Sequence, residues 1–399
     1  MNDPDPAVAP EDVDEWFEDE EEDVEAPPHT APQDPGAKYA SSQLRVVRET
    51  KDYQLDYLQH ALQPGRELID ISPTYQRRLR WSNKKKSLLI ESFLLNIPVP
   101  PIFLYERDYN EYEVIDGRQR LDAISSFLAN DFALTGLEYW PELARKRFRD
   151  LPVVLQRGLL RRSLPAVVLL AETKGLDGDA LDVRRVLFDR LNTGGIRLNP
   201  QELRNALYPG PFNAMVIRLA RSAPFTSPWD IPPYVAGEEA EPPDELLKNA
   251  LFASLADAEL VLRFFALRDA INNHKQGSLR AILDRFMAGH AATDGAELQA
   301  MEDLFISCLS RLTDVFGADT FRLPRTRRLS RPLYDALMVA LSRNPELDVE
   351  ARRDDIREAL SRALETTETY DILVGRGNTI LAVHARVELA ERILRAPGV

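Results

Sequence analysis

The stretch of sequence that decides the fold reads Glu111-Tyr112-Glu113-Val114-Ile115-Asp116-Gly117-Arg118-Gln119-Arg120-Leu121. Residues 111–115 form a short alternating run, which is typical of a strand, and Asp116-Gly117 supplies a turn. Leu121, Ile124, Phe127 and Leu128 then follow at spacings that place them on one face of a helix. The stretch therefore predicts a strand, a tight turn and an amphipathic helix in immediate succession.

Similar short elements flank this stretch. Asp108-Tyr109-Asn110 separates it from an apolar run, which predicts a hairpin. A polar start at Ser82 followed by apolar residues predicts a helix that Pro98 stops. The predicted strands are Leu68–Ile71, Pro101–Tyr105, Glu111–Ile115 and Leu164–Leu170.

From Asp179 onward the pattern is helical. Asn199-Pro200-Gln201-Glu202 marks a helix start, because Asn caps well, Pro suits the first helical position and Glu202 completes a capping box. Further amphipathic segments lie at 211–221, 244–270, 278–290, 297–316, 331–343, 348–366 and 378–396. The fold class is therefore α+β, with a small mixed sheet and helices followed by an all-helical carboxy-terminal region.

The amino-terminal segment is acidic and rich in proline. Residues 1–37 hold 14 acidic residues and no Lys or Arg, and the rest of the chain carries 50 acidic and 50 basic residues, so the net charge of −14 lies in this segment. We expect a disordered tail at 1–40, an α+β domain at 41–215 and a helical domain at 216–399. Because Trp16-Phe17 stands inside the acidic run, the segment is either a solubilising tail or a motif that docks on a basic surface of this chain or of a partner.

Composition and missing motifs exclude several classes of protein. The one cysteine, Cys308, excludes an internal disulfide framework, and its helical context predicts a buried thiol. The sequence has no GxxxxGK[ST] loop, no GxSxG elbow and no Cys/His nucleophile pattern. No apolar run reaches the roughly 18 residues of a membrane span, so we expect a cytoplasmic protein without a membrane partner.

The turn after Ile115 has the chemistry of an anion site. Amide groups at a helix start favour an anion, and the guanidinium groups of Arg118 and Arg120 suit bidentate phosphate recognition. Asp116 has three candidate roles, which are to hold a metal ion, to orient a water or to fix Arg120. The alternative is an ordinary strand–turn–helix junction with a solvated arginine pair.

Two other segments are also polar and turn-like. Tyr75-Gln76-Arg77 follows Pro73-Thr74, and Tyr75 is placed either to stack on a base or to pack in the core. Arg190-Leu191-Asn192-Thr193-Gly194-Gly195 ends one helix, and a ligand-binding loop and a simple helix cap both explain its glycines. In the same way, Glu202 is either a ligand contact or only the capping-box partner.

Taken in order, the three segments resemble the N-terminal domain of GmrSD-type, modification-dependent restriction systems, a family related to the ParB/sulfiredoxin fold. The family's hallmarks are a Tyr-Gln-Arg segment, an Asp-Gly-Gln-Gln-Arg turn and a Phe-x-Arg-Leu-Asn-x-Gly-Gly block that continues to Leu and Glu-Leu-Arg-Asn. Here they read Tyr75-Gln76-Arg77, Asp116-Gly117-Arg118-Gln119-Arg120, Phe188-x-Arg190-Leu191-Asn192-x-Gly194-Gly195, Leu198 and Glu202-Leu203-Arg204-Asn205. The resemblance covers roughly residues 45–215.

The resemblance implies nucleotide binding and hydrolysis in one pocket, coupled to DNA restriction or anti-phage defence. It implies GTP, CTP, ATP or UTP as ligand, with Mg²⁺ held at Asp116. The catalytic residues it implies are Asp116, Gln119 and Arg120. The nucleotide and phosphate contacts it implies are Tyr75, Gln76, Arg77, Gly117, Arg118, Arg190, Asn192, Thr193, Glu202 and Asn205.

Two departures from the family pattern leave alternatives open. Arg118 replaces the first Gln of the turn, which puts hydrolysis in more doubt than anion binding. No His-Asn-His nuclease pattern follows, so the chain is expected to act alone or with a separate nuclease or ATPase subunit. The alternatives are a non-catalytic DNA-binding module, a ParB-like nuclease component, a scaffold, and an acidic tail that mimics nucleic acid on a basic groove.

Overall fold

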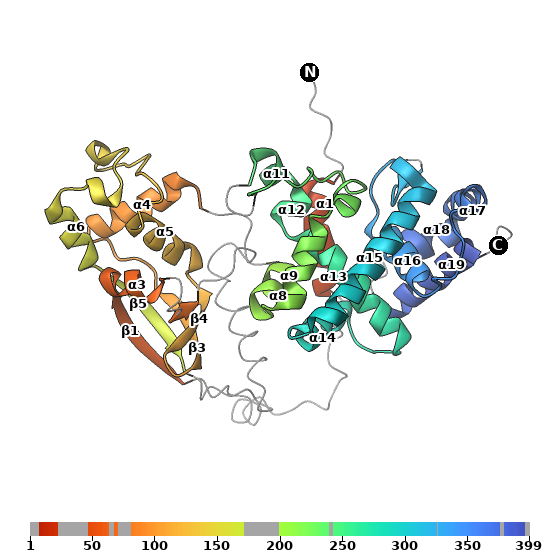
Figure 1. Cartoon of the computed structure of the whole chain (residues 1–399), viewed down its shortest axis with the longest axis horizontal. Helices are drawn as coiled ribbons and strands as arrows, with labels where there is room; N and C mark the ends of the chain where they lie inside the picture. Colours follow the sequence, from red (N-terminus) through yellow and green to blue (C-terminus); the bar gives the residue numbers. More distant parts are fainter. Residues whose placement is uncertain are drawn as a thin grey trace, which may run out of the picture. The chain divides into compact units, whose positions relative to one another are not determined.

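The structure, a computed structural model, describes residues 8–22, 47–63, 68–70, 81–170, 199–238, 242–324, 326–375 and 379–395. These residues form two compact units (Figure 1). The sheet unit comprises the described residues between 47 and 170, and the helical unit comprises 8–22 and the described residues from Asn199 onward. The expected α+β class is confirmed.

The sheet unit is built on a five-stranded mixed sheet with the order β1-β5-β3-β4-β2. Strand β1 is antiparallel to β5, β5 is parallel to β3, β3 is antiparallel to β4, and β4 is parallel to β2. The β3–β4 hairpin has the predicted turn, and Leu104 pairs with Val114 across it. The strands are β1 Arg48–Gln54, β2 Ile69–Asp70, β3 Ile102–Asp108, β4 Glu111–Asp116 and β5 Ser163–Leu169.

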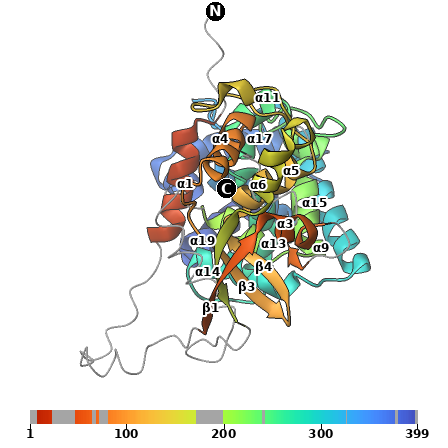
Figure 2. The same cartoon turned by 90° about the vertical axis from the view of Figure 1, so that its left-hand side faces the viewer.

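Helices α4, α5 and α6 lie together on one side of this sheet (Figures 1 and 2). The apolar face that the sequence predicts for α5 is buried, and Leu121, Ile124 and Phe127 share a core with Ile102 and Val114. The sheet unit also has two short 3₁₀ turns, at Pro141–Leu143 and Phe148–Asp150. Its helices are α3 Leu55–Ala61, α4 Asn83–Leu94, α5 Arg118–Leu128 and α6 Val153–Leu160.

The helical unit packs around α13 and α16, which are buried on nearly all sides. The thiol of Cys308 on α15 is buried as predicted. The helices are α1 Pro10–Glu22, α8 Pro200–Leu207, α9 Pro211–Ala220, α10 Ala223–Thr226, α11 Asp244–Lys248, α12 Ala250–Ala253, α13 Ala256–Asn272, α14 Leu279–His290, α15 Gly295–Phe316, α16 Arg331–Ser342, α17 Arg353–Glu365, α18 Thr367–Val374 and α19 Ile380–Arg395. None of the helices in the described residues is long and apolar enough to cross a membrane.

The amino-terminal segment differs from its prediction over Pro10–Glu22. The sequence predicts disorder there, but these residues form α1, and Val13 and Phe17 are buried in the core of the helical unit. The prediction is wrong because it used average composition, whereas a valine and an aromatic residue one helical turn apart are enough to dock an acidic helix. The alternative that the segment docks on its own chain is the one that the structure supports.

Candidate functional site

The candidate site is the junction between β4 and α5. Gly117 is left-handed, with a φ of 99°, and a Cβ at this position would lie 2.2 Å from Cγ2 of Ile102. Only glycine fits both conditions without strain, so the strand can turn directly into the helix. The carbonyl of Gly117 accepts hydrogen bonds from the backbone N–H groups of Arg120 and Leu121, each at 3.0 Å, which starts α5 at Arg118.

Asp116 and Arg120 form an ion pair across this turn. Nη2 of Arg120 lies 2.7 Å from Oδ2 of Asp116 and also donates to the carbonyl of Pro101 at 3.1 Å. The Arg120 side chain is 16% exposed and that of Asp116 is 37% exposed, so the pair sits at the edge of the core. One of the three candidate roles of Asp116, fixing Arg120, is therefore observed directly.

The guanidinium group of Arg120 has one buried hydrogen-bond donor that is not satisfied by the described residues. Its Nε is buried and has no hydrogen-bond partner within the part of the chain that the structure describes. A buried donor without a partner costs about 1–3 kcal/mol, so such a group is expected to have a partner in the functional state. A phosphate oxygen is a suitable partner, because a guanidinium presents parallel donors to anionic oxygens.

Gln119 connects Trp81 to this turn. Its Oε1 accepts a hydrogen bond of 3.1 Å from the backbone N–H of Trp81, which stands four residues after Arg77 in the sequence. Nζ of Lys85 lies 4.8 Å from the centroid of the Trp81 ring, which fixes the indole beside the start of α4. The turn and the chain at Trp81 therefore meet at Gln119.

The part of the third segment that is described belongs to the helical unit. Asn199 accepts from the N–H of Glu202 at 2.9 Å, and the Glu202 carboxylate accepts from the N–H of Asn199 at 3.0 Å. This is the predicted capping box, so Glu202 has a structural role here. Asn205 is fully buried, and its Oδ1 accepts from Nδ2 of Asn213 at 2.6 Å.

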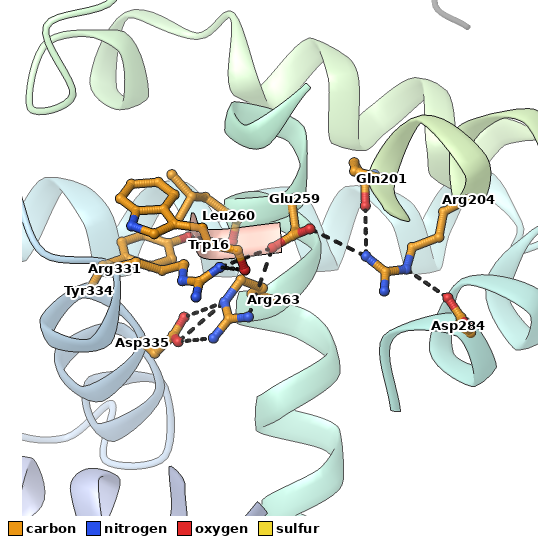
Figure 3. Close-up of polar contacts among 10 residues, drawn as sticks. All are labelled: Trp16, Gln201, Arg204, Glu259, Leu260, Arg263, Asp284, Arg331, Tyr334 and Asp335. Atoms are coloured by element: carbon orange, nitrogen blue, oxygen red, sulfur yellow. Dashed lines mark hydrogen bonds and ion pairs between the residues drawn. The ribbon is translucent and has the colours of Figure 1, made fainter. Parts of the chain in front are cut away.

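A buried network of charged residues continues from Arg204, a role that the sequence pattern did not indicate (Figure 3). Arg204 is 1% exposed, donates from Nε to Asp284 at 2.7 Å and lies 3.4 Å from Glu259. Glu259 is also 3.6 Å from Arg331 and 3.9 Å from Arg263, which pairs with Asp335. We call Arg204, Glu259, Arg263, Asp284, Arg331 and Asp335 the ion network.

The remaining site residues cannot be placed together. Tyr75, Gln76, Arg77, Arg190, Asn192 and Thr193 lie outside the described residues. That all three segments share one pocket therefore stays a prediction. Over the described ranges, no group of three or more His, Cys, Asp or Glu side chains is placed to hold a metal ion.

The fold and the β4–α5 junction are those of an α+β domain with a candidate phosphate-binding turn. Residues 58–209 match the family model of the GmrSD restriction endonuclease, N-terminal domain. This match confirms the resemblance for this part of the chain, and it extends from within α3 through α8. No curated protein matches the chain, and no solved structure does so either.

Proposed function

We propose that this chain is a nucleotide-binding and NTP-hydrolysing component of a DNA restriction or anti-phage defence system. The observation that carries the proposal is Arg120, a guanidinium fixed by Asp116 and Pro101 at a helix start, with its Nε buried and without a partner among the described residues. The family match supports the restriction context. Donors that are fixed before the ligand arrives are what phosphoryl transfer requires.

Each residue of the turn has an assigned role in this proposal. Arg120 binds a phosphate oxygen through Nε, and Gly117 lets the backbone approach the ligand. Gln119 orients a phosphate or water, and Arg118 adds positive charge at the helix start. Mg²⁺ fits the proposal as an ion that arrives with the nucleotide, because one carboxylate, Asp116, together with phosphate oxygens is a common magnesium ligand set.

The other contacts in the proposal come from the family pattern. Tyr75, Gln76 and Arg77 would contact the nucleotide from the first segment, and Arg190, Asn192 and Thr193 from the third. Glu202 and Asn205 are proposed only to hold α8, because both have partners within the helical unit.

A thermal-shift panel of ATP, GTP, CTP and UTP with Mg²⁺, followed by phosphate release, tests the proposal. A ligand that binds only the folded state raises the melting temperature. We expect one nucleotide to do so with the wild-type chain and not with Arg120→Ala. Arg149→Ala is the control, since Arg149 is 70% exposed on the same unit. Equal shifts and equal turnover in wild type and Arg120→Ala would end the assignment.

DNA binding by the sheet unit is a second candidate function, because the unit presents exposed basic residues. Arg145 and Arg149 are exposed in the chain before α6, and Arg157 and Arg161 are exposed within α6 and at its end. If these side chains contact phosphates, affinity for duplex DNA falls steeply with salt. Arg157→Ala/Arg161→Ala would then lower the slope of log K against log salt by about two. A slope equal to that of wild type would exclude these two side chains as phosphate contacts.

A further inference from the structure

The acidic helix α1 packs on a surface of the helical unit that includes Trp229 and Arg331, and we call this surface the seat. The apolar side chains of α1 point inward, with Val13 1% and Phe17 6% exposed, and Trp16 packs edge-on against Trp229 at 6.3 Å between ring centroids. The helix contacts α12 and α14 of the same unit (Figure 1). Val13, Trp16 and Phe17 stand three and four residues apart, which is the spacing by which an amphipathic helix enters a groove.

Arg331 contacts both the backbone of α1 and the ring of Trp16. Its Nη1 donates to the carbonyl of Trp16 at 2.9 Å, and its guanidinium carbon lies 5.2 Å from the centroid of the Trp16 ring (Figure 3). The same guanidinium faces Glu259 of the ion network at 3.6 Å. The seat thus has a built polar contact as well as an apolar floor.

Ion pairs near the seat neutralise its basic residues, which favours a helix over nucleic acid as the occupant. The basic residues from 322 to 331 read as a cluster in the sequence, but the described ones are paired within the chain. Arg322 pairs with Asp230, Arg327 with Asp319, and Arg328 with Asp12 of α1 itself. With these charges matched, the binding energy of the seat comes mainly from Val13, Trp16 and Phe17, which phosphates cannot replace.

The chain length around α1 makes it separable from the rest of the fold. Residues 23–46 stand between α1 and the stretch that leads into β1, and 24 residues can span up to about 80 Å. Leaving the seat therefore requires no other described element to move. A tethered helix of this kind behaves as a ligand held at high effective concentration.

We propose that the seat of α1 is a helix-binding groove, with α1 as its resident ligand, and that an acidic amphipathic helix of a partner protein replaces α1. The partner helix carries an aliphatic residue and two aromatic residues at the spacing of Val13, Trp16 and Phe17. This inference goes beyond nucleotide binding and does not depend on it.

A labelled peptide of residues 5–26 serves as the partner helix in the test. It is titrated by fluorescence anisotropy into the full-length chain and into full-length Val13→Asp/Phe17→Asp, whose own tail no longer fits. The variant binds the peptide, and wild type binds it about a hundredfold more weakly, because its tethered tail competes. In the variant background, Arg328→Glu lowers affinity about threefold, and a peptide with Asp12→Lys restores it. Arg353→Glu, at an exposed arginine of α17 in the same unit, is the matched control and leaves affinity unchanged.

Three results overturn the proposal. The first is a folded Val13→Asp/Phe17→Asp chain that does not bind the peptide, and the second is displacement of the peptide by duplex DNA. The third is dimerisation at the same concentrations, which makes a second copy the occupant. If the variant fails to fold, a protease site placed between residues 24 and 46 of the wild-type chain replaces it. After cleavage and dilution, release of the tail from a folded remainder supports the proposal, and a tail that never leaves refutes it.

Discussion

Arg120→Lys separates the ligand-binding role of Arg120 from its structural role. Lysine keeps the charge and can pair with Asp116, but it lacks Nε and the planar fork. In the free protein, Nε of Arg120 is buried without a partner among the described residues, at a cost of about 1–3 kcal/mol. Removing it offsets the lost hydrogen bond to Pro101, so we expect the free energy of unfolding to change by about 1 kcal/mol or less.

Nucleotide affinity is expected to fall much more than stability. A hydrogen bond from a guanidinium to a charged acceptor contributes about 1.5–3 kcal/mol, which corresponds to a rise in Kd of roughly 10- to 150-fold. Calorimetric titration with the nucleotide that gives the largest thermal shift measures this Kd, and urea unfolding measures stability. If wild type and Arg120→Lys bind that nucleotide with the same Kd, Nε is not the phosphate donor.

The other predictions concern the turn, the core and the thiol. Gly117→Ala is expected to destabilise the fold by about 2–4 kcal/mol in urea unfolding, because its φ is 99° and its Cβ would meet Ile102; a neutral result would show that the turn can relax. Glu91 accepts hydrogen bonds from the N–H groups of Glu138, Tyr139 and Trp140, and although burial opposes its ionisation, these bonds hold its pKa below the usual value. Glu91→Gln should therefore lower the free energy of unfolding by about 2 kcal/mol at pH 7. This difference from wild type should be fully present above the unfolded pKa of about 4.3 and should vanish as the pH falls through the lower folded pKa. Glu142→Gln, at an exposed residue, is the control and should show neither effect. Burial raises the pKa of Cys308 to about 11, so a thiol reagent at pH 8 should find no reactive thiol in the native chain and one after unfolding; a native reaction would contradict the buried position.

Elements with strong local signals could be predicted from the sequence. The β3–β4 hairpin, α4, α5 and the capping box of α8 all have signals within a few neighbouring residues, and the structure confirms them. The edge strand β1 has no such signal. Tyr53 is its only buried residue, and the other residues are polar, so the strand shows no alternation of apolar and polar residues. The range 244–270 was predicted as one segment but is three helices, since Asn249 and the left-handed Leu255 interrupt it.

Long-range pairs could not be predicted in the same way. Arg263 and Asp335 are 72 residues apart, and the sequence around each residue does not indicate which residue is its partner. The usable signal was local to α13, where Asp257, Glu259 and Arg263 stand within the otherwise apolar, buried run from Ala256 to Leu267. Charges inside a buried run of a helix require partners, so this pattern predicts a buried ion pair without identifying its other half. The helix α1 had a comparable signal in Val13, Trp16 and Phe17, which average composition concealed.

The residues of the family motif have different roles, and only some of them indicate a ligand pocket. Its last block, Glu202-Leu203-Arg204-Asn205, supplies a helix cap, a core side chain, a member of the ion network and a buried amide pair. All four are explained by the stability of the helical unit, so their presence in the motif does not argue for a ligand. The β4–α5 turn is different, because folding alone explains Gly117 and Asp116 but leaves Nε of Arg120 without a partner in the described chain. A buried donor without a partner at a helix start destabilises the free protein, and a bound anion removes this cost. Arg120, rather than the motif as a whole, is therefore the residue that indicates a nucleotide.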